Sequence, residues 1–199
     1  MSDASRIPVL LKGGARTPIG RFLGGLSHFS APQLGAIAVR AAVGRSGIDV
    51  RDVEEVIMGN VVTAGAGQAP ARQAAVGGGV PETVPALTIN KVCGSGLKAV
   101  MLAAQAIRAG DARLIVAGGM ESMSMVPHYL RGMRNGIKFG DQTIDDGLIF
   151  DGLWCSFGSC HMGGYAEYTA NKAGVSRDDA DKFSLRSHQK AVAAAEAGF

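Results

Sequence analysis

The sequence has little charge of either sign, few cysteines and no long apolar run, and each shortage excludes a class of protein. The net charge is only +3 and no run of Lys or Arg forms a stripe, so nothing favours nucleic-acid binding. Three cysteines, Cys93, Cys155 and Cys160, do not make the disulfide framework of a small secreted protein. No apolar run could span a bilayer, and the N-terminus MSDASRIPVLL does not read as a signal peptide. We therefore expect a cytoplasmic protein with no membrane partner.

What the chain does have is apolar residues and glycine. Hydrophobic residues make up 47% of the 199 positions, which can support a substantial core in one large domain or in a domain plus part of another. The 29 glycines are spread among apolar periodic segments, so collagen-like and disordered classes are excluded.

Strand-like and helix-like segments alternate over the first 120 residues. Short apolar or β-branched runs predict strands at 7–11, 53–63, 84–90 and 112–119. Helical periodicity predicts helices at 30–47, 69–79 and 97–110. The alternation indicates an α/β layer structure, and the continuous apolar strand at 112–119 indicates a sheet that is covered on both faces.

Two helices carry a capping box, in which the N-cap and the third helical residue exchange hydrogen bonds. Ser30 and Gln33 form the first, at the start of the helix over 30–47. Ser176 and Asp179 form the second, at the start of a helix predicted over 176–198. Both helix starts are therefore predicted closely.

From about residue 122 to 160 the sequence is rich in Met, Gly, Asp and aromatic residues and shows no clear period. This stretch predicts a long loop excursion. We accordingly divide the chain into an α/β domain at 1–121 and, at 122–199, an incomplete loop region with the helices that follow it.

The stretch NKVCGSGLKAV places Cys93 between a predicted strand and a predicted helix. Unpaired N–H groups and the helix dipole favour an anion at such a point, and a thiolate attacks thioester or carbonyl carbons. The same N–H groups could hold a developing oxyanion, and Gly94 and Gly96 would let the backbone bend tightly or approach a substrate. The alternative is a buried cysteine that acts as a small apolar residue, with glycines that serve packing.

Four motifs carry a resemblance to a known family: GGARTPIGRF (13–22), GNVVTAGAGQAPARQAA (59–75), NKVCGSGLKAV (90–100) and AGGMESMS (117–124). Together they resemble the N-terminal half of a thiolase, and more narrowly the short-chain biosynthetic type, the acetyl-CoA acetyltransferases. Ser95 and Lys98 favour this type. Leu11-Lys12-Gly13 departs from the small and apolar residues usual before ARTP, so that strand end is expected to be less regular.

The resemblance implies a thiolase-like α/β fold and an acyl-cysteine intermediate on Cys93. The reaction would condense two acetyl-CoA to acetoacetyl-CoA, or run in reverse, with coenzyme A as part of the substrate and neither a metal nor a further cofactor. It also implies a homodimer or homotetramer.

The segment DGLWCSFGSCHMGGYAE (151–167) resembles the family's loop that lines the pantetheine channel. By that match Leu153, His161 and Met162 contact coenzyme A. A metal site at Cys155, Cys160 and His161 is disfavoured, because the cluster is too small and too close in sequence for tetrahedral ligation. Glu121 is interpreted as structural, because the family places its base elsewhere.

The family's Gly-His-Pro and second Cys-x-Gly motifs do not occur in this sequence. A second hypothesis therefore stays open, in which the chain is a catalytically inactive coenzyme A-binding or interaction module.

The helix at 97–110 is apolar on nearly every side, which predicts a central buried helix in the complete fold. Without a second half to cover it, we expect partial exposure and a tendency to associate. This apolar face comprises Val100, Leu102, Ala103 and Ile107.

Overall fold

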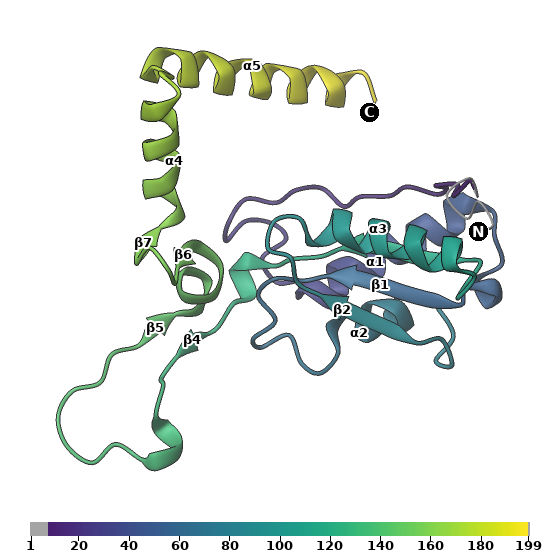
Figure 1. Cartoon of the computed structure of the whole chain (residues 1–199), viewed down its shortest axis with the longest axis horizontal. Helices are drawn as coiled ribbons and strands as arrows, with labels where there is room; N and C mark the ends of the chain where they lie inside the picture. Colours follow the sequence, from purple (N-terminus) through teal and green to yellow (C-terminus); the bar gives the residue numbers. More distant parts are fainter. Residues whose placement is uncertain (1–7, 199) are drawn as a thin grey trace. The chain divides into compact units, whose positions relative to one another are not determined.

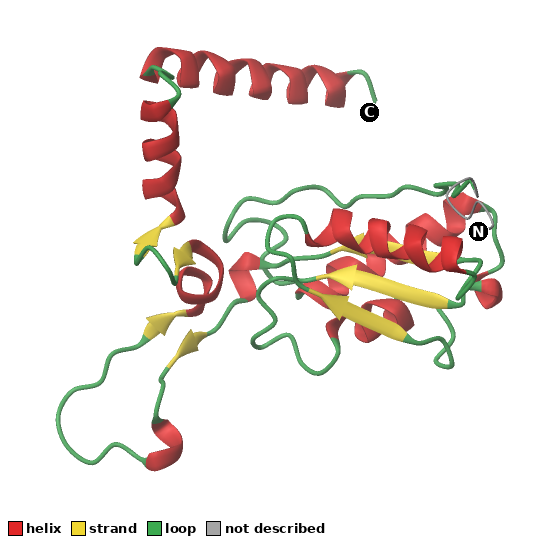
Figure 2. Cartoon of the chain, in the orientation of Figure 1, coloured by secondary structure: helices red, strands yellow, loops and turns green. Residues whose placement is uncertain are grey.

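The computed structural model describes residues 8–198, and a parallel three-stranded sheet lies at the centre of its first part. The strands are β1 (Glu55–Gly59), β2 (Ala86–Ile89) and β3 (Ile115–Gly119), in the order β2-β1-β3. Strands β1 and β2 lie side by side in Figures 1 and 2. Val56 of β1 is in register with Ala86 on one side and Val116 on the other. All three strands lie within the predicted ranges; β1 and β2 are shorter than predicted at both ends, and β3 is shorter at its start only.

Helices cover both faces of this sheet, as the apolar strands indicate. The helices are α1 (Ala31–Ser46), α2 (Pro70–Gly77) and α3 (Ser95–Ala109). Side chains alternate between the two faces of β1. Val56 and Met58 join a core cluster with α1 and α2, whereas Ile57 packs with Ala99 and Ala103 of α3. The predicted α/β layers are therefore present.

Both predicted capping boxes are confirmed. The Ser30 N–H donates to Gln33 Oε1 at 2.8 Å, and the Gln33 N–H donates to Ser30 Oγ at 3.4 Å. Ser176 and Asp179 make the equivalent pair at the start of α5 (Arg177–Glu196).

The strand predicted at 7–11 is wrong for its described residues. Ile7 lies outside the described range, and residues 8–13 belong to no helix or strand. Leu10 and Leu11 are 87% and 81% exposed. A strand needs a hydrogen-bonded neighbour, and none of the described residues pairs with this extended segment.

One face of α3 is buried and the other is open to solvent. Ser95, Ala99 and Ala103 are buried, whereas Leu97 is 69% exposed and Met101 is exposed as well. Of the four apolar residues expected to be uncovered, Ala103 is buried and the other three, Val100, Leu102 and Ile107, are half-buried. The expected partial exposure is therefore confirmed for Val100, Leu102 and Ile107 and wrong for Ala103, which packs with Ile57 of the sheet.

The predicted excursion contains only short elements. They are η3 (Met123–Met125), β4 (His128–Tyr129), η4 (Met133–Asn135), β5 (Asp145–Asp146) and the π-helix η5 (Leu148–Leu153). β4 and β5 pair antiparallel, with Tyr129 opposite Asp145, and Arg131 forms an ion pair with Asp145 at 2.6 Å. The segment between these two strands is exposed almost throughout.

The described residues divide into two compact units between Gly152 and Leu153. The second unit holds β6 (Trp154–Cys155), β7 (Cys160–His161), α4 (Met162–Lys172) and α5. The sequence pattern did not predict α4, because Gly163 and Gly164 weaken the helical signal in its first turn. Among the helices described, none has both the length and the apolar character needed to cross a membrane. The domain boundary at 121/122 stays a prediction.

Candidate functional site

Three loops meet where the parallel strands end. Strands that run the same way bring their carboxyl ends to one edge of the sheet, the edge at which α/β proteins bind ligands. A Cβ placed on Gly59, at the end of β1, would lie 2.6 Å from the Ser95 carbonyl carbon. A Cβ on Gly119, at the end of β3, would lie 3.1 Å from Gly96 Cα. The start of α3 therefore packs backbone against backbone on this edge.

Cys93 lies just before α3 and is exposed. The alternative in which this cysteine is a buried apolar residue is therefore wrong. Gly94 is the N-cap of α3, and its position places the thiol-bearing residue directly at the helix N-terminus. This is the end at which the helix dipole and the first N–H groups favour negative charge.

The two glycines of the motif differ in what they do. Gly94 has a φ of −88°, which any residue adopts, and a Cβ there would find Lys91 O at 3.5 Å as its nearest atom. Gly96 packs against Gly119, so it serves the close contact between helix and sheet. The tight bend falls instead on Val92, which has a φ of +48°. The role of Gly94 and Gly96 beside a substrate stays a prediction.

Ser95 fixes this bend from inside the fold. It is 4% exposed, its hydroxyl donates to the Val92 carbonyl at 2.6 Å, and the Lys91 N–H donates to the same hydroxyl at 2.8 Å. Asn90 holds the other side, because its Oδ1 accepts from the Val92 N–H at 2.8 Å. The sequence analysis did not assign this role to Asn90 or Ser95. Asn and Ser side chains often form hydrogen bonds with nearby backbone groups, so an Asn and a Ser five positions apart around a turn were a possible signal.

Glu121 organises the loop that follows β1. Its carboxylate accepts from the Asn60 side chain at 2.8 Å, from the Val61 N–H at 2.8 Å and from the Val62 N–H at 3.3 Å. Partial burial raises the pKa of Glu121 above its ordinary value, while these three hydrogen bonds act in the opposite direction. The contacts agree with the structural interpretation of Glu121.

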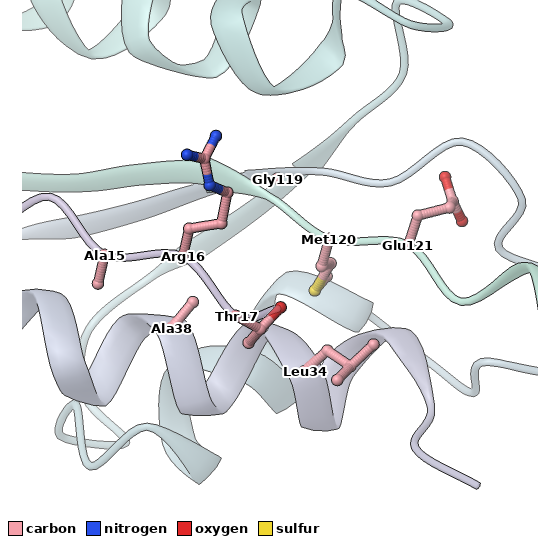
Figure 3. Close-up of a pocket in the computed structure, with 9 residues that line it drawn as sticks. Ala15, Arg16, Thr17, Leu34, Ala38, Gly119, Met120 and Glu121 are labelled. Atoms are coloured by element: carbon pink, nitrogen blue, oxygen red, sulfur yellow. The ribbon is translucent and has the colours of Figure 1, made fainter. Parts of the chain in front are cut away.

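A cavity of about 290 Å³ lies on the opposite face of the sheet from α3. Figure 3 shows the segment with Ala15, Arg16 and Thr17 running between α1 and the end of β3, with the Arg16 side chain directed away from α1. Leu34 and Ala38 of α1 and Met120 line the cavity as well. Since α3 covers the other face, this cavity is separate from the Cys93 site.

The residues predicted to contact coenzyme A lie together at one hairpin of the second unit. Trp154 pairs with His161, so Leu153 and Met162 flank the same end of that hairpin. The His161 Nδ1 accepts from the Gly163 N–H at 3.0 Å and thereby caps α4. These three residues and Cys93 belong to different compact units.

Cys155 and Tyr165 interact in the same hairpin region. The Gly158 N–H donates to Cys155 Sγ at 3.3 Å, and this bond, followed by one from Tyr165, lowers the pKa of the Cys155 thiol. The hydrogen bond with Cys155 in turn raises the pKa of Tyr165 to about 12.

Comparison with known proteins agrees with the motifs. The family described as "Thiolase, N-terminal domain" matches residues 9–199. An acetyl-CoA acetyltransferase of Cupriavidus necator is 53% identical over 190 residues, which are 96% of this chain and 48% of that protein. A cytosolic acetyl-CoA acetyltransferase of Gibberella zeae is 53% identical over 191 residues, with the same two coverages. A probable acetyl-CoA acetyltransferase of Escherichia coli is 50% identical over 190 residues.

The chain belongs to the thiolase family and corresponds to its N-terminal domain. It spans about half the length of the curated relatives that it matches. The resemblance and the thiolase-like α/β fold class predicted from sequence are both confirmed.

Proposed function

We propose that Cys93 is the nucleophile of an acetyl-CoA acetyltransferase, and that this chain carries the nucleophile half of the reaction. The observation that carries the proposal is the exposed thiol at the N-terminus of α3, within a chain of the thiolase family. The names of its relatives support acetyl-CoA as the substrate.

The chemistry follows from the position of the thiol. The Cys93 thiol gives up its proton and its sulfur attacks the thioester carbon of acetyl-CoA, the carbon–sulfur bond to coenzyme A breaks, and coenzyme A leaves as a thiol that carries the proton lost by Cys93. The first N–H groups of α3 lie where they can stabilise the oxyanion of the tetrahedral intermediate. A base then removes a proton from the α-carbon of a second acetyl-CoA, and this carbon attacks the carbonyl carbon of the acetyl-cysteine. The carbon–sulfur bond to Cys93 breaks, Cys93 takes up one proton and is restored as a thiol, and acetoacetyl-CoA is released; thiolysis is the same sequence reversed.

The second unit supplies the contacts with coenzyme A in this proposal. Leu153 and Met162 offer apolar contact to the pantetheine arm. His161 uses Nδ1 to cap α4, which leaves Nε2 for a polar group of the ligand. Coenzyme A enters as part of the substrate, and the reaction needs no further cofactor or metal.

We also propose a homodimer or homotetramer in the cytoplasm. Membership of the thiolase family supports this association, because the resemblance to that family implies an oligomer. The name of the Gibberella zeae relative places that protein in the cytosol, and the three free cysteines fit a reducing setting.

The alternative is a catalytically inactive coenzyme A-binding or interaction module. The Gly-His-Pro and Cys-x-Gly motifs of the family do not occur in these 199 residues, which span about half the length of the relatives. In this alternative the fold binds coenzyme A or a protein and transfers no acetyl group.

Intact-mass spectrometry separates the two functions. The 199-residue chain is incubated with acetyl-CoA beside two variants, Cys93→Ala and the matched Cys155→Ala. We expect one acetyl group on the wild type and on Cys155→Ala and none on Cys93→Ala.

Hydrogen exchange of the same samples establishes that the chain is folded. An acetyl group that persists in Cys93→Ala, or none on a folded wild type, would contradict the nucleophile assignment in this chain. Retained binding of coenzyme A without acetyl transfer would then support the inactive module.

A further inference from the structure

The residue before Cys93 has a backbone conformation that its side chain disfavours. Val92 has a φ of +48°, in the left-handed region, and it is β-branched. A β-branched residue in this region is an outlier, because its side chain crowds the backbone. Such conformations persist only where the surroundings impose them, and they cluster at functional sites. The question is which residues impose this one beside the proposed nucleophile.

Hydrogen bonds hold Val92 through both of its backbone groups. Its N–H donates to Asn90 Oδ1 at 2.8 Å. Its carbonyl accepts from the Ser95 hydroxyl at 2.6 Å and from the Ser95 N–H at 3.1 Å. Ser95 is buried within α3, whereas Asn90 is exposed, so the two residues differ in what else they do. The hydroxyl of Ser95 is buried and needs hydrogen-bond partners wherever the turn lies. The side chain of Asn90 is exposed and could bond to water instead, so burial does not explain its contacts with the turn.

Asn90 also ties the turn to the rest of the sheet edge. Its Nδ2 donates to the Val61 carbonyl at 3.2 Å, in the loop after β1. The Val61 N–H in turn donates to Glu121, which follows β3. One amide thus links the Cys93 turn after β2 to a loop that the carboxylate after β3 holds in place. Only a side chain with a donor and an acceptor can make both bonds, and an amide has both.

We propose that Asn90 is a positioning residue for Cys93. It holds Val92 at positive φ and fixes the turn against loop 60–62, and this keeps the thiol aligned with the N-terminus of α3. The inference rests on the proposed function only in that Cys93 is taken as the reactive group. It concerns the reactivity of the thiol, which is measurable without any acetyl transfer.

The first experiment measures the alkylation rate of each cysteine in the 199-residue chain with iodoacetamide at pH 7, by peptide mass spectrometry. Asn90→Leu keeps the size of the side chain and removes both hydrogen bonds. We expect it to slow Cys93 alkylation by about fivefold or more, because the thiol loses its fixed alignment with the helix N-terminus. Cys155 and Cys160 serve as internal references and should stay within about twofold of the wild type.

Asn135→Leu is the matched control, since Asn135 is exposed and lies in η4, away from the turn. We expect no change at Cys93 in that variant. A Cys93 rate in Asn90→Leu equal to the wild type overturns the proposal. An equal change at all three cysteines overturns it as well, because that result reports general loosening of the fold.

A second pair of variants tests the route through Val92. Glycine adopts positive φ without steric cost, so in a Val92→Gly background the turn needs less support from Asn90. We expect the effect of Asn90→Leu to shrink from about fivefold to less than about twofold in that background. An undiminished effect would show that Asn90 does not act through Val92. Failure of the proposed function gives a different result. In that case acetyl-CoA leaves no acetyl group on the wild type, while Asn90→Leu still slows the alkylation of Cys93.

Discussion

Strand β1 and helix α5 are stabilised in opposite ways. Four of the five residues of β1 are buried, and its neighbours come from residues 86–89 and 115–119. Helix α5 has twenty residues, and among them none is buried; it has a capping box and ion pairs between Arg177 and Asp181 and between Asp178 and Lys182. The sheet thus depends on contacts distant in sequence, whereas α5 is specified by neighbours along its own chain. Substitutions should separate these two kinds of stability.

The largest effect is expected from a charge in the sheet core. Val56→Asp places a carboxylate at a side chain that is 0% exposed, and an unpaired buried charge costs about 4 kcal/mol or more. We expect β1 and β3 amides to lose protection from hydrogen exchange while α5 amides exchange as before. The matched control is Val192→Asp on α5, at an exposed position, which should change stability by less than about 0.5 kcal/mol. Equal loss of protection in both regions would show that the two units fold together.

Replacing a glycine with alanine should change the free energy of unfolding by a smaller amount, and with opposite signs in the two units. Gly59→Ala forces a Cβ into the Ser95 backbone, so we expect a loss of about 1–3 kcal/mol in a denaturant titration. Gly164→Ala, in α4, meets nothing within 4 Å and should favour its helix by about 0.5–1 kcal/mol. A neutral Gly59→Ala would show that the start of α3 can move away from the sheet.

A small effect, confined to the start of one helix, is expected at a helix cap. Ser176→Ala removes the side-chain acceptor for the Asp179 N–H, which should weaken α5 by about 1 kcal/mol. Faster exchange of the first α5 amides, with β1 amides unchanged, is the measurement. Ser187→Ala, within the same helix, is the control and should leave those first amides as they are. If β1 amides also exchange faster, α5 contributes to the stability of the sheet.

The parts of the fold that sequence predicted are those with a local signal. Helix starts at Ser30 and Ser176 follow from residues three positions apart, and β1, β2 and β3 follow from short apolar runs. The strand at 7–11 failed because an apolar run does not reveal whether a neighbour exists to pair with it. Helix α4 was missed because two glycines interrupt its first turn.

The same distinction holds at the site. The place of Cys93 before α3 follows from a strand, a cysteine and a helix in immediate succession. The bonds from Asn90 to Val61 and from Asn60 to Glu121 join residues 29 and 61 positions apart, and no periodicity marks such pairs. The positive φ of Val92 was likewise invisible, because glycine is the residue that usually indicates one.

The antiparallel pairing of β4 and β5 allows the segment between these two strands to vary in length. Tyr129 and Asp145 lie opposite each other, so the exposed segment between them leaves the fold and returns to the same point. The free energy of closing a loop grows only with the logarithm of its length, and doubling the length costs about 0.6 kcal/mol. Insertions at 130–144 therefore carry a small entropic penalty, and this is the position where a homologue could gain or lose residues without rebuilding the sheet.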